Sequence, residues 1–552
     1  MRALLDEAGK TTAMFHPLPP PEPAWELLGR AQNVAAESVE KILAHPYVGS
    51  WVGYTTRLYR HDVSSDLPLW VHVGHIRCIA AAAAILAGIP FEIEVPVWHR
   101  YVTLPTLGMA KLGTGDPCSV AVVRSHGGQV EVDNGRGRVR VHRADPHWYP
   151  VREVVLEASE RRLALRLDDV DLYRGLYEPQ RPSRLTAEEV EPWRSVLEGA
   201  WRLLTTHLPA VADAFPEGLE SVVPEPAVPF RLPSASTGEA FGSAIIAYSS
   251  DPAAMAAALV HEFQHIRLGG LLHLLPLHDE DRRERFYAPW RDDPRPLGGV
   301  IHGIYAFFGV AAFWRALSRA EPQNLLAGFE FALWRRQTWH TLLTIRNDSA
   351  ITQAGRRFLS GIAGALGPWQ TEPVAAESMR WVHRAVADHY AGWRIRHLRP
   401  APDLVGELVD AWCNGTRRPG SLPPDPAPSP VPDGRWPDAR TDLIRLRLSD
   451  GGTEELLVRG PSVPGSTPAD LAFVAGRTAE AVTGYRKELA AAPDNPSALA
   501  GLGLALAAST TDPVSRALVH RPELVRAVYR ALRPDTAVSP ESVAEWIGRN
   551  VS

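Results

Sequence analysis

An H-E-x-x-H motif formed by His261, Glu262 and His265 has the residue types and spacing best suited to chemistry. In a helix, residues four apart lie one turn apart on the same face, so both imidazoles can reach one metal ion. A glutamate beside such a pair serves either as the general base of a metallopeptidase or as a group that orients a ligand. The motif therefore predicts a metal centre, and the third ligand decides its class.

The residues around the motif predict the helix that it needs. Asp251 is a favourable N-cap, Pro252 suits the first helical position, and the alanines that follow are strong helix formers. Pro276 marks the far end. The helix is apolar almost all round, so we expect it to be buried, with a strand over 242–248 leading into it. Buried imidazole and carboxylate groups need partners, which favours a metal site over surface histidines.

Three residues are candidates for the third ligand. His273 is roughly 12 Å further along the helix axis than His265, so it could bind only if the helix breaks at the two glycines between them. Glu330, in a later predicted helix, would complete a gluzincin-like site, or it is a buried, paired carboxylate. His302 stands near the start of an apolar helix, where a buried polar side chain needs a hydrogen-bond partner or a metal ion. From the residues alone the choice stays open.

Three blocks of sequence resemble the HExxH-type 2-oxoglutarate-dependent peptide β-hydroxylases, which modify ribosomally made peptides. The blocks are F-R-L-P-S-A-S-T-G-E-A-F-G (230–242), L-V-H-E-F-Q-H-I-R-L-G-G-L-L-H-L-L-P-L (259–277) and Y-A-P-W-R-D-D-P-R-P-L-G-G-V-I-H-G-I-Y-A-F-F-G-V (287–310). The shorter segments H-P-Y-V-G-S-W and L-P-T-L-G-M-A are also similar. The resemblance runs from about residue 40 to about residue 400 and leaves out the C-terminal part.

The resemblance implies Fe(II) as the metal, with 2-oxoglutarate and O₂ as cosubstrates. It implies hydroxylation of a β-carbon in a ribosomally synthesised precursor peptide, with succinate and CO₂ as the other products. A radical-SAM peptide maturase of the same pathway is an expected partner. Three ligands on one face of an octahedron leave positions for both cosubstrates, and the implied ligands are His261, His265 and His302.

The resemblance also assigns roles around the metal. Glu262 would orient a ligand or water and would not act as a base. The distal carboxylate of 2-oxoglutarate needs a forked cation. Arg295 is the first candidate for that role, and Arg291, in the same loop, is the second.

Two other functions fit the motif. A zinc metallopeptidase would use His261 and His265, with Glu330 or His302 as third ligand and Glu262 as general base. A peptide-binding scaffold without catalytic activity would instead use the C-terminal part of the chain to hold a partner. Consumption of 2-oxoglutarate separates the first two functions, and metal content separates both from the scaffold.

Composition describes an ordinary globular protein of two or more domains, with 552 residues, 45% hydrophobic and 22% charged. A net charge of −5 argues against nucleic-acid binding. The three cysteines, Cys78, Cys118 and Cys413, are too widely spaced for a thiolate cluster and fit a reducing cytoplasm. The N-terminus has no signal-peptide core, and the longest apolar run, around 78–89, is too short to span a bilayer. We therefore expect a cytoplasmic protein without a membrane segment.

The predicted fold class is α+β, with a predominantly helical catalytic domain, a smaller β-rich region and a C-terminal accessory domain. The predicted boundaries are a flexible lead-in over 1–24, a helical and β-rich region over 25–207, the metal-binding region over 208–415, a proline-rich linker over 416–439 and the accessory domain over 440–552. The accessory domain is expected to begin with a β-hairpin (443–448 and 455–458) and to contain a tetratricopeptide-like helical hairpin. His72 and His75, before the second predicted helix, are expected to be structural.

Overall fold

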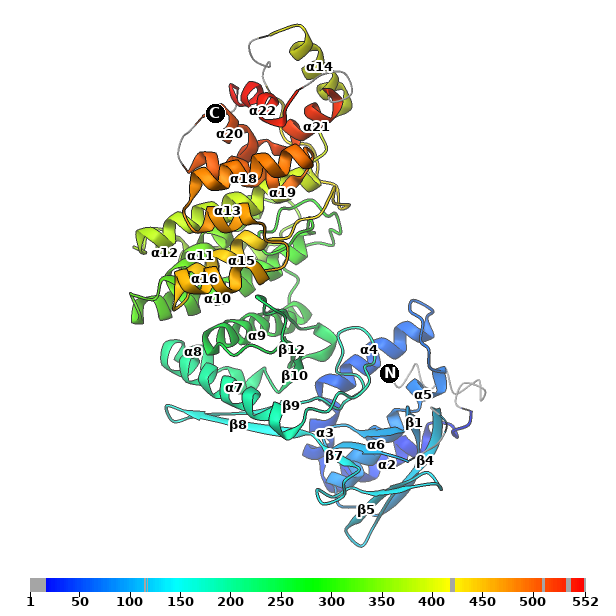
Figure 1. Ribbon diagram of the computed structural model, residues 1–552. Coiled ribbons are helices and arrows are strands. Elements are labelled where there is room, and N and C mark those ends of the chain that lie inside the picture. The colour runs from blue at the N-terminus through cyan, green and yellow to red at the C-terminus, as the bar shows by residue number, and fades with distance from the viewer. Residues whose placement is uncertain are drawn as a thin grey trace. The chain divides into compact units, whose positions relative to one another are not determined.

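The computed structural model describes residues 16–113, 116, 118–416, 422–508, 512–532 and 538–550 (Figure 1). It is a mixed α+β protein, as predicted, with a β-rich part and an all-helical C-terminal part. The chain forms two compact units. The first comprises residues up to 228 together with 232–271, and the second comprises 229–231 together with the residues from 272 onward.

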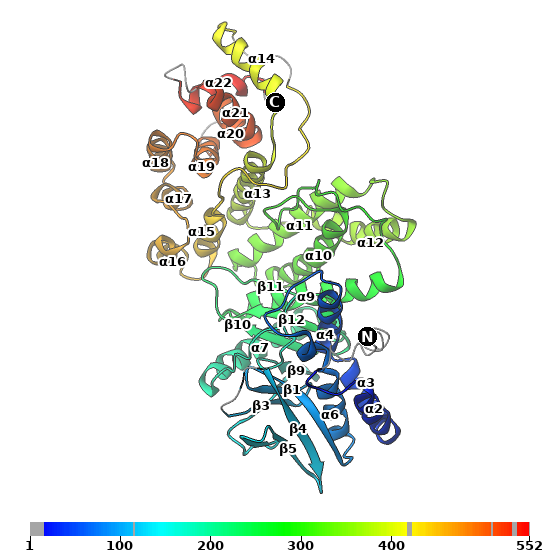
Figure 2. The same ribbon diagram turned by 90° about the vertical axis from the view of Figure 1, so that its right-hand side faces the viewer.

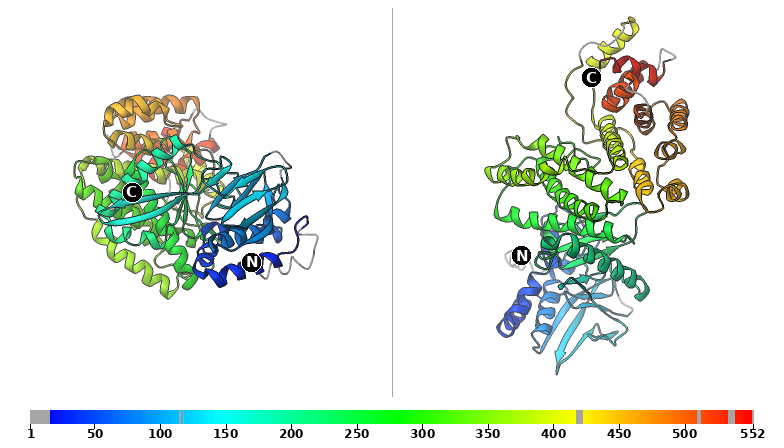
Figure 3. Two further views of the ribbon diagram at one scale, coloured as in Figure 1. Left: turned by 90° about the horizontal axis from the view of Figure 1, so that it is seen from below. Right: turned by 90° about the vertical axis from the view of Figure 1, so that its left-hand side faces the viewer.

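The first unit contains a seven-stranded antiparallel sheet in the order β6-β5-β4-β1-β2-β3-β7. Its strands are β1 (Phe91–Trp98), β2 (Tyr101–Leu104), β3 (Gly108–Lys111), β4 (Cys118–His126), β5 (Gln129–Asp133), β6 (Arg138–Arg140) and β7 (Trp148–Pro150). The accompanying helices are α2 (Glu22–Val34), α3 (Ala36–Leu43), α4 (Pro46–Tyr59), α5 (Leu69–Val73) and α6 (Ile76–Leu86). Residues 80–84 of α6 are five buried alanines, small enough for this helix to pack closely on β1 and β2. Figure 3 shows the N-terminal helices, in darker blue, beside the light-blue strands of this sheet. The predicted β-rich region is confirmed.

A second, mixed sheet of the first unit leads to the metal-binding motif. Its strands are β8 (Arg152–Ala158), β9 (Arg161–Leu167), β10 (Ser221–Glu225), β11 (Ser234–Ala235) and β12 (Ser243–Ala247), in the order β11-β12-β10-β9-β8. Strand β10 runs parallel to β9 and β12, and the other pairs are antiparallel. Around it lie α7 (Ala187–His207), α8 (Pro209–Ala212) and the short 3₁₀ turns η2 (Phe215–Glu217) and η3 (Gly238–Ala240). Strand β12 leads directly into α9 (Pro252–Leu274), as predicted.

The regular elements among the described residues of the second unit are all helices, with only isolated β-bridges besides them (Figure 2). The segment 275–296, before the first long helix of the unit, is irregular. Its helices are α10 (Leu297–Ala320), α11 (Leu325–Ile345), α12 (Gln353–Trp369), α13 (Ala376–His397), α14 (Pro402–Cys413), α15 (Ala439–Leu448), α16 (Gly452–Arg459), η4 (Gly460–Ser462), α17 (Pro468–Val474), α18 (Thr478–Ala491), α19 (Pro496–Ala507), α20 (Pro513–His520), α21 (Pro522–Leu532) and α22 (Pro540–Gly548). Helix α11 and the helices from α13 to α22 share one apolar core.

The predicted β-hairpin over 443–448 and 455–458 is wrong, because both segments are helical, in α15 and α16. The run L-I-R-L-R-L alternates like a strand, but Ala439, Leu443 and Leu446 also follow the helical spacing of four and three, and all three are buried. The glycine of the expected hairpin turn, Gly451, has a φ of 82° and lies just before α16.

The predicted linker over 416–439 does not separate two compact units, because its described residues from 422 onward pack within the second unit. Arg394 of α13 donates to Asp425 of this stretch at 2.6 Å and to Glu523 of α21 at 2.8 Å. The predicted lead-in over 1–24 is also too long: α2 already begins at Glu22, and residues 1–15 lie outside the described part of the chain. Proline density alone therefore misplaced the boundary.

Two stretches of the described residues are long and apolar enough to cross a membrane, Leu69–Leu86 and Leu297–Ala320. Within the structure, 78% of the first and 61% of the second are buried. Core helices commonly pass the same test, so the two stretches are weak evidence for a membrane span.

Candidate metal centre

Helix α9 forms as its local signals predict. The Asp251 carboxylate accepts a hydrogen bond from the backbone N–H of Ala253 at 2.8 Å, which caps the first turn. The helix then continues without interruption through Gly269 and Gly270 to Leu274. On its buried side, Phe263 stacks on Phe215 with ring centroids 4.3 Å apart. This packing holds α9 within the first unit and so sets the direction that the motif-bearing face of the helix takes.

The two histidines of the motif converge. Nε2 of His261 lies 3.1 Å from Nε2 of His265, and the ring centroids are 4.7 Å apart. Two nitrogens each about 2.1 Å from one metal ion lie about 3.0 Å apart at a right angle and about 3.4 Å apart at a tetrahedral angle. The observed separation fits two adjacent ligands of a single ion.

The charge state of His261 suits metal binding. Burial lowers the pKa of His261 to about 4, because a charged imidazole loses its hydration inside the protein. At neutral pH the ring is therefore uncharged and keeps a lone pair that a metal ion can use.

Glu262 is 1% exposed, and both of its carboxylate oxygens accept hydrogen bonds. The hydroxyl of Ser234 donates to Oε1 and the hydroxyl of Ser236 donates to Oε2, each at 2.6 Å. Burial raises the pKa of Glu262, and the two serine hydrogen bonds act in the opposite direction. Nε2 of His261 lies 3.9 Å from Oε1 of Glu262. Glu262 is thus held by two hydroxyl groups beside the histidine pair.

The sequence analysis did not single out the two serines. They come from β11 and the residue that follows it, and they lie in the first of the three blocks that resemble the peptide β-hydroxylases. Ser234 and Ser236 are two residues apart, so in extended backbone their side chains lie on the same side. That spacing was visible in the sequence, but nothing local connected it to Glu262.

Two of the candidates for the third ligand, His273 and Glu330, have surroundings that argue against that role. His273 is exposed near the end of an unbroken α9, so the break that it required does not occur. Glu330 is buried in α11 and accepts from Nε of Arg445 and from Nε1 of Trp334, both at 2.7 Å. Of the two possibilities that the sequence left open for Glu330, these contacts favour a buried, paired carboxylate.

His302 lies in the second turn of α10 and belongs to the second unit. Burial lowers its pKa, and the neighbouring His278 lowers it further. Within the described part of the chain, no three His, Cys, Asp or Glu side chains are grouped closely enough to hold a metal ion. The structure therefore brings His261 and His265 together and leaves the third ligand to be identified.

The two candidate arginines for 2-oxoglutarate share one carboxylate. Arg291 and Arg295 each donate to Asp293 at 3.0 Å. Burial acts to raise the pKa of Asp293, but the hydrogen bonds from both arginines hold it below its usual value. Arg295 is further fixed by its backbone, which exchanges two hydrogen bonds with Phe286 at 2.9 and 3.1 Å. The two guanidinium groups thus share one carboxylate oxygen pair, one oxygen each.

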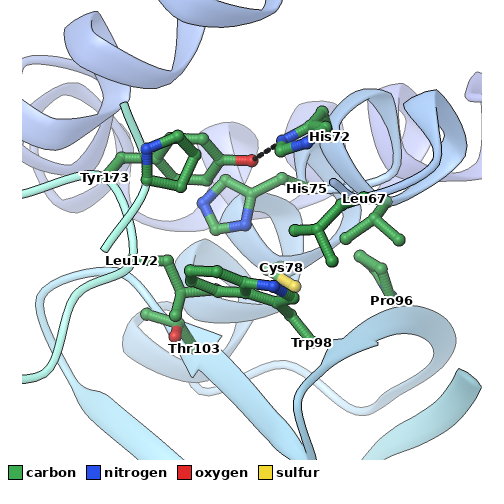
Figure 4. Close-up of a pocket in the computed structure, with 11 residues that line it drawn as sticks. Leu67, His72, His75, Cys78, Pro96, Trp98, Thr103, Leu172 and Tyr173 are labelled. Carbon is green, nitrogen blue, oxygen red and sulfur yellow. Dashed lines mark hydrogen bonds between the residues drawn. The ribbon is translucent and has the colours of Figure 1, made fainter. Parts of the chain in front are cut away.

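His72 and His75, which the sequence predicts to be structural, are both buried in the first unit. Nδ1 of His72 lies 3.0 Å from the hydroxyl group of Tyr173 (Figure 4). Nε2 of His72 lies 3.0 Å from the hydroxyl group of Ser65. Burial lowers the pKa of His72 to about 4 and that of His75 to about 3. The cavity beside them, which Cys78 also lines, measures only about 10 Å³, enough for a single water molecule.

No model of a known protein family matches this chain, and no curated protein matches it.

Proposed function

We propose that this protein is an Fe(II)- and 2-oxoglutarate-dependent oxygenase that hydroxylates the β-carbon of a residue in a ribosomally made precursor peptide. The proposal starts from the resemblance of three sequence blocks to the HExxH-type peptide β-hydroxylases. The converging imidazoles of His261 and His265 support a metal site. The state of Glu262 supports an oxygenase over a peptidase, and it is the observation that carries the proposal.

A peptidase of this motif needs its glutamate to take a proton from a metal-bound water. Such a base must keep one oxygen facing that water. Here Ser234 and Ser236 donate to the two different oxygens of Glu262, each at the short distance of 2.6 Å. A carboxylate held in this way can orient the neighbouring ligand groups. It is poorly placed to exchange a proton with a metal-bound water.

The proposed ligands are His261, His265 and His302, with Fe(II) as the ion. Bound Fe(II) supplies the redox chemistry that couples decarboxylation of 2-oxoglutarate by O₂ to hydroxylation. The protein residues hold and tune this site. Glu262 lies beside the histidine pair, where its negative charge favours a bound cation. The expected products are succinate, CO₂ and a peptide that carries one added hydroxyl group.

The second step of the proposal assigns the cosubstrate carboxylate to Arg295, with Arg291 as the alternative. Both guanidinium groups share the Asp293 carboxylate, so one of them can turn to a second carboxylate without leaving Asp293 unpaired. Arg295 is favoured because its side chain is 32% exposed and its backbone is anchored, whereas the Arg291 side chain is 54% exposed. A half-buried guanidinium loses less of its binding energy to solvent.

Substitution of Arg295 tests this assignment. Arg295→Ala is expected to raise the apparent KM for 2-oxoglutarate roughly 10- to 150-fold, the loss of one charge-assisted hydrogen-bonded pair. Arg295→Lys is expected to raise it less, because lysine keeps the charge and loses the fork. The measurement is succinate formation as a function of 2-oxoglutarate concentration, with the iron content checked in each variant.

Arg291→Ala is the matched control, since it removes the other partner of Asp293. A large rise for Arg291→Ala with an unchanged KM for Arg295→Ala would transfer the role to Arg291. An unchanged KM in both variants, with iron bound, would contradict both assignments.

Partners and location follow from the same proposal. The helical hairpin of α18 and α19, joined at residues 492–495, is the segment that we compare with a tetratricopeptide unit. Such hairpins serve as peptide- or protein-binding surfaces. We propose the precursor peptide as substrate, a radical-SAM peptide maturase as a companion enzyme and the cytoplasm as the place of action.

A further inference from the structure

The second unit contains a pocket of about 400 Å³ to which the proposed function assigns no ligand, although Arg291, the second candidate for the cosubstrate carboxylate, lies in its wall. Its walls come from the irregular segment before α10 and from α10, α11, α13 and α15. Helix α10 packs on α11, α11 packs on α13, and α13 packs on α15 (Figure 2). A pocket of this size holds one or two amino-acid side chains. Its lining combines an aromatic wall with charged groups.

The aromatic wall consists of three rings. Trp290 stacks on Phe307 with centroids 5.0 Å apart, and Phe307 stacks on Trp334 with centroids 4.1 Å apart. A Cβ atom on Gly303 would lie 2.1 Å from the ring of Trp290, so only glycine at this position lets the indole pack against α10. Trp334 is fixed by its hydrogen bond to Glu330. The wall is therefore held from both ends.

Asp438 supplies an unmet acceptor in this pocket. It precedes α15 at the N-cap position with a φ of 54°, in the left-handed region, and its side chain makes no capping hydrogen bond. Its Oδ1 atom is buried and accepts no hydrogen bond within the described part of the chain, while Oδ2 is 3.9 Å from Nη2 of Arg231. Burial raises the pKa of Asp438, nearby Arg445 and Arg231 lower it, and Asp292, which also lines the pocket, raises it again. A cation with N–H donors would satisfy this atom.

Arginines also line the pocket, but each already faces a carboxylate. Arg445 pairs with Glu330 at 2.7 Å and Arg291 pairs with Asp293 at 3.0 Å. Arg231 lies 3.5 Å from a carboxylate oxygen of Asp442. An anionic ligand would have to compete with these carboxylates, whereas a cation meets an oxygen that still lacks a donor. The charge arrangement therefore favours a cationic ligand.

We propose that this pocket binds an arginine side chain of the peptide substrate, with its guanidinium plane against the aromatic wall and its N–H groups directed to Asp438. A guanidinium is the side chain that both stacks on aromatic rings and donates several hydrogen bonds in one plane. The identification of the ligand as a peptide rests on the proposed function. The preference for a guanidinium rests on the pocket alone.

The test uses N-acetyl-L-arginine amide as the probe, titrated into the full-length, metal-free protein by calorimetry. N-acetyl-L-citrulline amide is the matched probe, nearly identical in shape and uncharged. We expect the arginine probe to bind at least about 10-fold more tightly than the citrulline probe, as for a charge-assisted hydrogen bond. Asp438→Asn is expected to weaken arginine binding by a similar factor, and asparagine tolerates the left-handed backbone.

Two further variants separate binding from folding. Gly303→Ala leaves every charge in place and displaces Trp290, so it too is expected to weaken the arginine probe. Asp410→Asn changes an exposed carboxyl of α14 that does not line the pocket, and it is expected to leave affinity unchanged.

Equal affinity for the arginine and citrulline probes would overturn the proposal, and so would full affinity in Asp438→Asn. Tighter binding of N-acetyl-L-glutamate amide, or displacement of the arginine probe by 2-oxoglutarate, would also overturn it by making the pocket an anion site. Because the titrations of the arginine and citrulline probes contain neither metal nor cosubstrate, their outcome is independent of whether the protein turns over 2-oxoglutarate.

Discussion

His261→Ala and His265→Ala are each expected to abolish stoichiometric metal binding. The two Nε2 atoms are 3.1 Å apart on one face of α9, so each substitution removes one of two adjacent ligands. Metal affinity depends steeply on ligand number, because the remaining ligands must then be supplemented by water. The measurement is metal content per chain after anaerobic loading with Fe(II) and removal of unbound ion.

His273→Ala is the control on the same helix. It removes an imidazole that is exposed near the end of α9, and metal content is expected to stay at the wild-type level. His302→Ala is expected to weaken binding strongly. If His302→Ala retains tight binding, the set of three histidine ligands is wrong; a loss of metal in Glu330→Gln would then identify the carboxylate as the third ligand in spite of its contacts with Arg445 and Trp334.

Glu262→Gln is expected to keep metal binding and measurable 2-oxoglutarate turnover. Glutamine has nearly the same shape, and the hydroxyl groups of Ser234 and Ser236 can rotate to donate to its oxygen and accept from its nitrogen. In a peptidase the same change removes the general base and costs roughly 10²- to 10⁴-fold in rate. The measurement is succinate formation, with assays for peptide-bond cleavage run in parallel.

Glu262→Ala gives the contrasting result. It leaves two half-buried hydroxyl groups without their acceptor and opens a cavity beside the histidine pair. We expect a lower free energy of unfolding and weaker metal binding, which the glutamine variant avoids. Peptide cleavage by the wild type that disappears in Glu262→Gln would instead identify a peptidase.

The parts of the fold that were predictable are those encoded locally. Helix α9 begins and ends where Asp251, Pro252 and Pro276 place it, because caps and prolines act within one turn of the chain. Helix α7 likewise begins with a capping box between Thr186 and Glu189. The convergence of the two motif histidines followed from helical spacing alone.

Long-range pairings were not predictable. Ser234 and Ser236 reach Glu262 across 28 and 26 residues because β11 pairs with β12, and no local pattern records that pairing. The proline-rich stretch was taken for a linker because prolines exclude regular structure. Nothing in the sequence revealed that Asp425 pairs with Arg394, which ties this stretch to α13 of the second unit.

The most direct test is to load the protein with Fe(II) without oxygen, add 2-oxoglutarate and a candidate precursor peptide, and then admit O₂. Succinate and the mass of the peptide are measured together. The proposed function predicts O₂-dependent succinate and a peptide heavier by one oxygen atom for each succinate formed. Peptide cleavage by the zinc-loaded protein, with no succinate from the iron-loaded protein, would contradict it.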